Sequence, residues 1–163
     1  MSRLLNNNRG LTLIELIVTM VILGILGAMV LPSIQLANKR SKEIELKRDL
    51  REIRGALDDY KKTYDKAVQD GKLQVVVDES GYPATLQTLV DGFDFGGLYP
   101  TKKKFLRRIP MDPFHKVAGD EVRWKLRAYN DDIDSNSWGG KDVFDVSSLS
   151  EETAIDGTKY KDW

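Results

Sequence analysis

The chain has 163 residues, with 25 basic and 25 acidic side chains and no cysteine. A formal charge of zero gives no global field that would attract nucleic acid, and the absence of cysteine excludes disulfides, thiol nucleophiles and Cys-based zinc sites. The mean hydropathy is −0.38 although the chain begins with a long apolar run, so the remainder must be strongly polar, and the length fits one small domain with an attached segment.

The first predicted element is an apolar helix over residues 11–31, in which Thr12, Glu15 and Thr19 are the only polar side chains. At about 1.5 Å per residue it would reach about 31 Å, which is the hydrocarbon thickness of a bilayer. Basic residues before the run favour a cytoplasmic N-terminus, with everything after Pro32 across the membrane. A cleaved secretory signal peptide and an uncleaved signal anchor are the two ordinary explanations of such a run.

The start of this run resembles the prepilin peptidase site of type IV pilins and type II secretion pseudopilins. The string that carries the resemblance is Arg9-Gly10-Leu11-Thr12-Leu13-Ile14-Glu15-Leu16. The resemblance implies a leader of residues 1–10, cleavage between Gly10 and Leu11, and N-methylation of Leu11. It also implies that the hydrophobic helix is retained. Family members most often have Phe where this chain has Leu11.

Glu15 is the one charged side chain inside the apolar run. A carboxylate within hydrocarbon costs on the order of a few kcal/mol, which makes it a functional-site hypothesis. Cleavage would create a free amine at Leu11, about one helical turn away. The hypothesis, which the resemblance also implies, is that Glu15 of an incoming subunit pairs with the Leu11 amine of its neighbour and sets the axial register of assembly. The alternative is that Glu15 lies near the cytoplasmic end and only reaches out to water.

Gly24, Gly27 and Pro32 weaken the apolar helix. Each glycine costs about 1 kcal/mol of helix stability, and Pro32 removes a backbone donor. Resemblance to pilins implies that this part of the helix bends or unwinds when the subunit leaves lipid for the filament. Small-residue packing between membrane helices is the alternative.

The helical period continues through residues 34–70, where charged side chains surround a single apolar stripe. The stripe consists of Leu46, Leu50, Ile53, Leu57, Tyr60, Tyr64 and Ala67. A coiled coil is one possible partner, but only about three heptads exist, so packing against the soluble residues 71–163 is favoured. Together the two halves predict one helix of roughly 55 residues.

The soluble residues 71–163 alternate and turn in a way that predicts a small sheet. Strands are expected at residues 72–77, 122–129 and 142–148, the last two antiparallel across a loop at 130–141, with a short helix in 82–90 that has Pro83 near its first turn. The fold class is α+β. A long N-terminal helix, membrane-spanning over residues 11–33, packs by its second half on a small antiparallel sheet, as in the type IV pilin fold.

Two further segments resemble the major, G-type pseudopilins. Residues 82–90 followed by 102–114 match a Tyr-Pro helix, a lysine-rich segment and a Pro-x-Asp-Pro-aromatic turn, and residues 145–163 match a closing strand, a loop and a terminal Trp. In the turn, two prolines fix backbone angles and Asp112 is expected to cap nearby amides.

Calcium is the only cofactor that the chain suggests. Many type IV pilins close the C-terminal loop with a disulfide, which this chain cannot form, whereas major pseudopilins often close it with calcium. The candidate ligands are Asp156, Ser150 and Glu151, which offer the hard oxygens that calcium prefers. Residues 132–136 have the spacing of a calcium loop's start, yet Ser137 stands where Gly is needed. Capped polar turns are the alternative.

Nothing in the sequence indicates an enzyme. His115 is the only histidine, and the GxSxG, P-loop and HExxH patterns are absent. The basic residues 102–108 and the acidic residues 131–163 suggest complementary, salt-sensitive contacts between adjacent subunits, although a basic segment is also often only a solvated face. Nucleic-acid binding is not expected, because the basic cluster is isolated.

The sequence therefore predicts a structural subunit of a type II secretion pseudopilus that polymerises into a periplasmic filament supporting protein export. Expected partners are further copies of the chain, the prepilin peptidase, the inner-membrane secretion platform and minor pseudopilins. Glu15 favours a shaft subunit, since the tip-type minor pseudopilin typically lacks this residue. Before assembly the chain would be a single-pass inner-membrane protein with a periplasmic head. A type IVa pilin or minor pilin of an adhesion or motility filament, and a signal-anchored periplasmic binding module, remain the alternatives.

Overall fold

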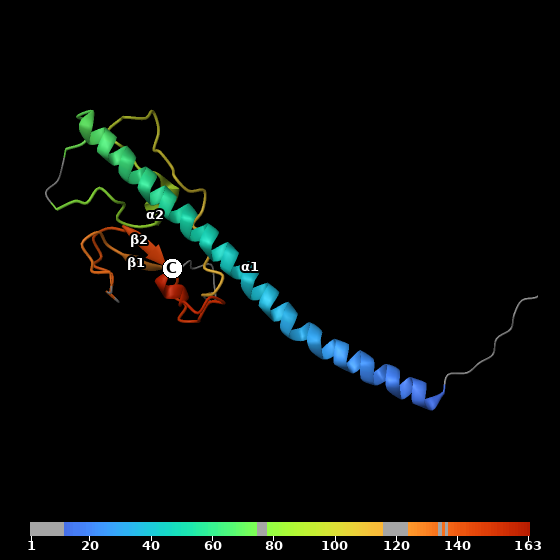
Figure 1. Cartoon of the computed structure of the whole chain (residues 1–163). Helices are drawn as coiled ribbons and strands as arrows, with labels where there is room; N and C mark the ends of the chain where they lie inside the picture. Colours follow the sequence, from blue (N-terminus) through green and yellow to red (C-terminus); the bar gives the residue numbers. More distant parts are fainter. Residues whose placement is uncertain (1–11, 75–77, 116–123, 134, 136) are drawn as a thin grey trace, which may run out of the picture. The chain divides into compact units, whose positions relative to one another are not determined.

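A computed structural model describes residues 12–74, 78–115, 124–133, 135 and 137–163, without the side chains of residues 29–33 (Figure 1). The chain divides into two units, Met1–Arg40 and Ser41–Trp163. The order of elements is α1, α2, β1, β2 and a final 3-10 helix, η1.

Helix α1 spans Leu13–Gln69, which is 57 residues, so the prediction of one long helix is confirmed. Within the second unit its apolar stripe is the helix side of the core: Leu46, Ile53 and Leu57 are fully buried, and Tyr64 is partly buried. The same core also contains side chains from later parts of that unit, including Leu89, Phe95, Trp124, Val143, Val146 and Tyr160. The helix therefore finds its partner in the soluble residues, as expected, and not in a coiled coil.

The strand expected at residues 72–77 is wrong for its first half, and residues 75–77 lie outside the described structure. The amides of Lys72 and Leu73 both donate to the carbonyl oxygen of Ala67, at 2.8 and 3.2 Å, and Gly71 has φ +66°. These bonds satisfy a carbonyl at the end of α1, so the same amides are not available to a sheet.

Helix α2 covers Gln87–Asp91, so the short helix exists but begins later than predicted. Pro83 lies outside it, and its carbonyl oxygen accepts the amide of Val143 at 2.8 Å. Leu89 of α2 is fully buried, and its carbonyl accepts the amides of Phe105 and Leu106. Beside it, the ring of Tyr60 meets Phe93, Phe95 and Phe105 at centroid distances of 5.2 to 5.7 Å.

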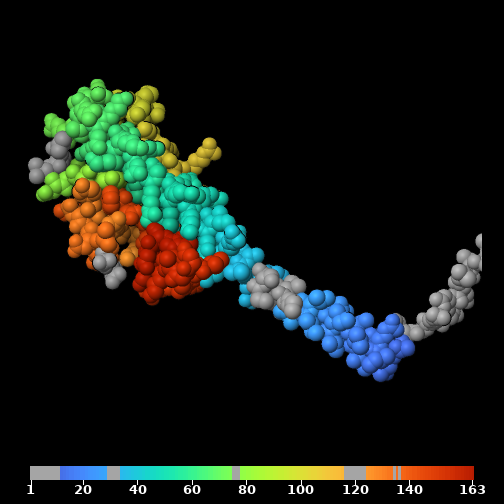
Figure 2. Space-filling model, in the orientation of Figure 1, coloured from blue at the N-terminus to red at the C-terminus, as the bar shows by residue number. Residues whose placement is uncertain are grey.

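Strands β1 (Lys125–Arg127) and β2 (Asp145–Ser147) form an antiparallel pair with Leu126 opposite Val146. The two expected strands are thus present, shorter than their alternating patterns suggested. A sheet of two three-residue strands is not stable alone, so it depends on its packing against α1. In the space-filling view the C-terminal residues, in red, lie against this sheet region and the teal part of α1 (Figure 2).

The Pro-x-Asp-Pro turn has the expected architecture. Asp112 is 1% exposed; its Oδ1 accepts the amide of Phe114 at 2.8 Å and its Oδ2 accepts the hydroxyl of Ser148 at 2.6 Å. Trp124 donates its indole N–H to the carbonyl of Pro110 at 3.0 Å. The turn therefore joins the end of β2 to the start of β1.

Candidate functional site

The N-terminal site begins at the first turn of α1. Gly10 and Leu11, the predicted cleavage and methylation residues, lie outside the described residues. The hydroxyl oxygen of Thr12 accepts the backbone N–H of Glu15 at 3.3 Å, so Thr12 is the N-cap and Glu15 the third helical residue. This T-x-x-E arrangement is a capping-box sequence, a signal in the sequence that the pattern analysis overlooked.

Glu15 is exposed, and its carboxylate has no hydrogen bond or ion pair with any residue that the structure describes. Its place in the first turn is favourable, because the positive end of the helix dipole lies there. The proposed partner, the amine of a neighbouring Leu11, belongs to another copy, so pairing stays a prediction.

Gly24 and Gly27 both lie in continuous helix, and no atom lies within 4 Å of the Cβ that either position would carry. The side chain of Pro32 lies outside the described structure. The predicted bending or unwinding of this segment belongs to a different state of the subunit, and it stays a prediction.

The described apolar side chains at the start of α1 are uncovered. Eleven large hydrophobic residues between Leu13 and Leu26 are 46 to 78% exposed. Exposed apolar area on this scale marks a surface that lipid or protein covers. Among the residues that the structure describes, no helix combines the length and the apolar character needed to cross a membrane.

The predicted calcium ligands are occupied by separate local contacts. Asp156 accepts the amide and the hydroxyl of Thr158 at 2.9 and 2.6 Å, Ser150 accepts the amide of Glu152 at 3.3 Å, and Glu151 lies 3.6 Å from the ammonium of Lys161. The described part of the chain holds no group of three or more His, Cys, Asp or Glu side chains that could hold a metal ion. The calcium prediction is therefore not supported, and the residues fit the alternative of capped polar turns. In residues 132–136, which have the spacing of a calcium loop's start, Asp134 and Asn136 lie outside the described residues.

Several acidic side chains of residues 131–163 have partners inside the chain. Asp131 caps the amides of Ala128 and Gly139, which lowers its pKa, and Asp142 accepts the hydroxyl of Ser80 at 2.6 Å. The basic segment 102–108 is also partly internal, since Lys103 donates to the hydroxyl of Thr63 at 2.8 Å. The charges left for contacts between subunits are therefore fewer than the sequence suggested.

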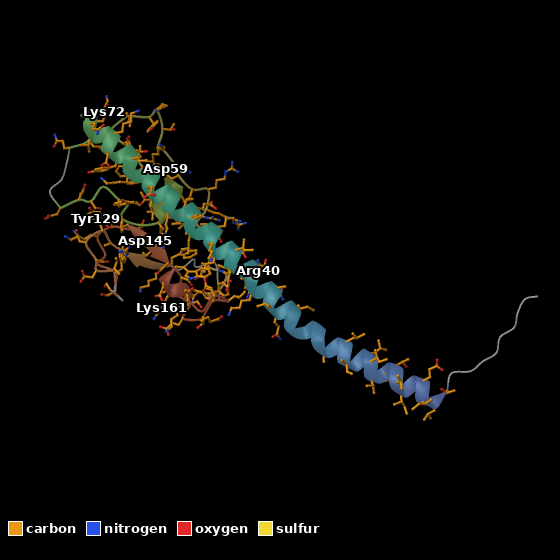
Figure 3. All side chains as sticks on the ribbon, in the orientation of Figure 1. Arg40, Asp59, Lys72, Tyr129, Asp145 and Lys161 are labelled. Carbon is orange, nitrogen blue, oxygen red and sulfur yellow. The ribbon has the colours of Figure 1, made fainter. Side chains whose placement is uncertain are left out.

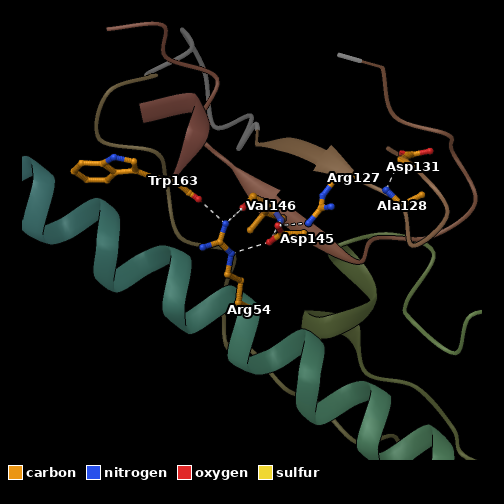
Figure 4. A network of polar contacts seen from close by, with 7 residues as sticks. All are labelled: Arg54, Arg127, Ala128, Asp131, Asp145, Val146 and Trp163. Atoms are coloured by element: carbon orange, nitrogen blue, oxygen red, sulfur yellow. Dashed lines mark hydrogen bonds and ion pairs between the residues drawn. The ribbon is translucent and has the colours of Figure 1, made fainter. Parts of the chain in front are cut away.

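Arg54 of α1 is a central residue that sequence reasoning missed. Its Nε donates to Asp145 at 2.7 Å, and its Nη2 donates to the backbone oxygens of Val146 and Trp163 at 2.9 and 2.6 Å (Figure 4). Arg127 of β1 donates to the other oxygen of Asp145 at 2.9 Å. One guanidinium thus joins α1, β2 and the last residue of the chain.

The two arginines also set the charge state of Asp145. Burial acts to raise its pKa, but the hydrogen bond from Arg127, the charge and hydrogen bond of Arg54, and the Val146 amide together hold the pKa below its ordinary value. Figure 3 shows Asp145 and Lys161 on the same side of α1, among the side chains of the sheet and the C-terminal segment.

Comparison with known proteins gives one match at the N-terminus and several matches over about two thirds of the chain. The family described as "Prokaryotic N-terminal methylation motif" matches residues 5–31. A protein named type II secretion system core protein G from Klebsiella pneumoniae is 30% identical over 115 residues, covering 68% of this chain and 71% of that protein. The protein of the same name from Pseudomonas aeruginosa is 34% identical over 111 residues, covering 64% and 67%. The one from Escherichia coli is 27% identical over 117 residues, covering 69% and 70%. No solved structure matches the chain.

Proposed function

Since the chain belongs to the type II secretion system core protein G family, we infer that it is a structural subunit of a type II secretion pseudopilus. Two findings together carry this function. The methylation motif matches residues 5–31, and the Klebsiella pneumoniae core protein G is 30% identical over 68% of the chain. The long helix on a small antiparallel sheet is the fold expected for such a subunit.

We propose that the subunit is made with a leader, residues 1–10, which the prepilin peptidase removes before Leu11 is methylated. Residues 11–31 then hold the subunit in the inner membrane, with the second unit in the periplasm. The apolar side chains between Leu13 and Leu26 support this proposal, because they are exposed in the single chain and need lipid or protein around them.

Assembly transfers these apolar side chains from lipid to neighbouring copies. In the proposed register, the Glu15 carboxylate of one copy meets the Leu11 amine of another. Thr12 supports the proposal, because its cap fixes the first turn and so gives the Glu15 side chain a defined starting position. A secretion platform and minor pseudopilins are the further partners in this proposal.

We also propose that the subunit has no catalytic activity, because its relatives are core proteins of a secretion system. Its one histidine supports this view. In the described residues, the strongly shifted pKa values belong to tyrosines of the core. Burial raises the pKa of Tyr60 to about 12, as expected of a packed phenol and not of an acid–base catalyst.

Mass spectrometry of the N-terminus tests the proposal. In cells that carry a prepilin peptidase, we expect a chain that begins at Leu11 and carries one added methyl group. The variant Gly10→Val should remain uncut, which controls for cleavage by other proteases. A wild-type chain that keeps Met1 and has no methyl group would contradict the proposed processing.

A further inference from the structure

The segment that follows β2, residues 148–163, turns back on itself before it ends. Thr153 and Lys159 form an isolated antiparallel bridge, and the amide of Ala154 donates to the carbonyl of Thr158 at 2.7 Å. Gly157 has φ +89°, a backbone conformation that side chains rarely allow. The loop is therefore closed at its base by its own backbone.

Two groups of this segment that meet Glu43 of α1 are donors. The backbone N–H of Ile155 and the hydroxyl of Tyr160 both donate to Oε1 of Glu43, at 2.7 and 2.8 Å. Burial, together with the hydrogen bond to Glu43, raises the pKa of Tyr160, so its hydroxyl keeps its proton and acts as a donor. A calcium loop has the opposite polarity, because its oxygens converge on a cation.

Two other side chains of α1 continue the same contact. The ammonium of Lys47 lies 4.0 Å from the ring centroid of Trp163, and Arg54 donates to the backbone oxygen of that residue at 2.6 Å. Glu43, Lys47 and Arg54 are spaced four and seven residues apart, so they lie on one face of the helix. The ring of Tyr160 is fully buried and stacks on Phe114 at 3.9 Å.

Two carboxylates of this segment already have partners within it. Oδ1 of Asp156 accepts two bonds from Thr158, which lower the pKa of Asp156. A second carboxylate, Glu151, lies beside Lys161. Calcium needs six to eight oxygens, and the described loop does not bring a matching set together.

We propose that residues 148–163 are held on α1 by a carboxylate latch, Glu43, and that closure of this segment requires no calcium. The Glu43 carboxylate holds the segment by accepting hydrogen bonds from its donor groups. A calcium ion would instead be bound by the segment's acceptor oxygens. This inference goes beyond the proposed function, because it concerns how the head is closed and not what the subunit assembles into.

Hydrogen–deuterium exchange and thermal unfolding of the purified full chain in detergent test the latch. We expect an unchanged melting temperature with added calcium chloride or with a chelator. In Glu43→Ala the amide of Ile155 should exchange about 10- to 100-fold faster, as expected when a hydrogen bond to a charged group is lost. Glu43→Gln keeps an acceptor oxygen without the charge and should show a smaller increase.

The matched control is Glu45→Ala, two residues along the helix. Glu45 is exposed and makes no hydrogen bond or ion pair within the described residues, so exchange in the loop should not change. A melting temperature that falls with the chelator or rises with calcium would overturn the proposal. So would an Ile155 amide that exchanges at the wild-type rate in both Glu43 variants. Neither measurement depends on filament assembly, so these results are separate from those that test the proposed function.

Discussion

Replacing Arg54 with Met tests whether one guanidinium holds the sheet and the chain's last residue on α1. Methionine keeps an unbranched side chain of similar reach but removes all donors. Three hydrogen bonds are lost, to Asp145, Val146 and Trp163. Among the residues that the structure describes, Asp145 would keep only Arg127 as a cationic partner.

The loss in stability follows from these contacts. Arg54 is 39% exposed and Asp145 25%, so water screens the ion pair and limits it to about 0.5–1 kcal/mol. The two bonds to backbone oxygens add about 1 kcal/mol each. The sum is about 2–3 kcal/mol, which lowers the melting temperature of a chain of this size by about 5–10 °C. Arg51→Met is the matched control. Arg51 is exposed on the same helix and has no hydrogen bond or ion pair among the described residues, and its loss should leave the melting temperature nearly unchanged.

The pH dependence gives a second, independent readout. The folded pKa of Asp145 is depressed, so its contribution to stability is present above about pH 4 and is lost as the pH falls through the folded pKa. Without Arg54 this contribution is smaller from the start. Circular dichroism melts should therefore show the largest gap between wild type and Arg54→Met near pH 7 and a narrower gap near pH 3. A gap that does not change with pH, or an Arg51→Met variant that is equally unstable, would refute the assignment.

Two further variant pairs test other parts of the chain. Thr12→Ala removes the cap at a cost of about 1 kcal/mol but keeps the charge of Glu15, so filaments should still form. Glu15→Gln keeps the capping box but loses the charge, so the yield of sheared filaments should fall about 100-fold or more. Normal yields from Glu15→Gln would reject charge pairing. Gly96→Ala should destabilise the head by about 2–4 kcal/mol in urea unfolding, because Gly96 has φ +63° and its added Cβ would collide with the carbonyl of Lys72. Gly55→Ala, at an open helical position, should instead stabilise by up to about 1 kcal/mol; equal effects at the two positions would refute the argument.

Sequence reasoning was most reliable where one physical period decides the structure. The spacing from Leu46 to Ala67 predicts which face of α1 is buried, because burial of apolar area dominates the free energy of folding. The alternation around Leu126 and Val146 likewise predicts two strands that pair.

Prediction failed where backbone groups bond in ways that side-chain patterns do not record. Residues 72–74 have the composition of a strand, yet the amides of Lys72 and Leu73 close the end of α1. Proline is a residue typical of a first helical turn, yet the carbonyl of Pro83 accepts the amide of Val143, which is sixty residues further along. The calcium hypothesis is not supported for a related reason: the sequence shows which residues carry oxygens, but it does not show which hydrogen bonds those oxygens already accept.

The polar contacts explain why the C-terminal segment occupies one position along α1 and not another. Apolar packing is non-directional, so the buried stripe alone would tolerate a shift of the segment along the helix. A shift of one turn would separate Glu43 from the N–H of Ile155 and the hydroxyl of Tyr160. The buried Tyr160 hydroxyl would then be left unsatisfied, at a cost of about 1–3 kcal/mol. The same shift would remove the backbone acceptors of Arg54. The apolar stripe therefore selects the face of α1 that is covered, and the charged side chains beside it select the register. The partner of each of these charged side chains lies more than ninety residues away in the sequence. Composition and spacing therefore predict a charged helix face but not the partners of its charges.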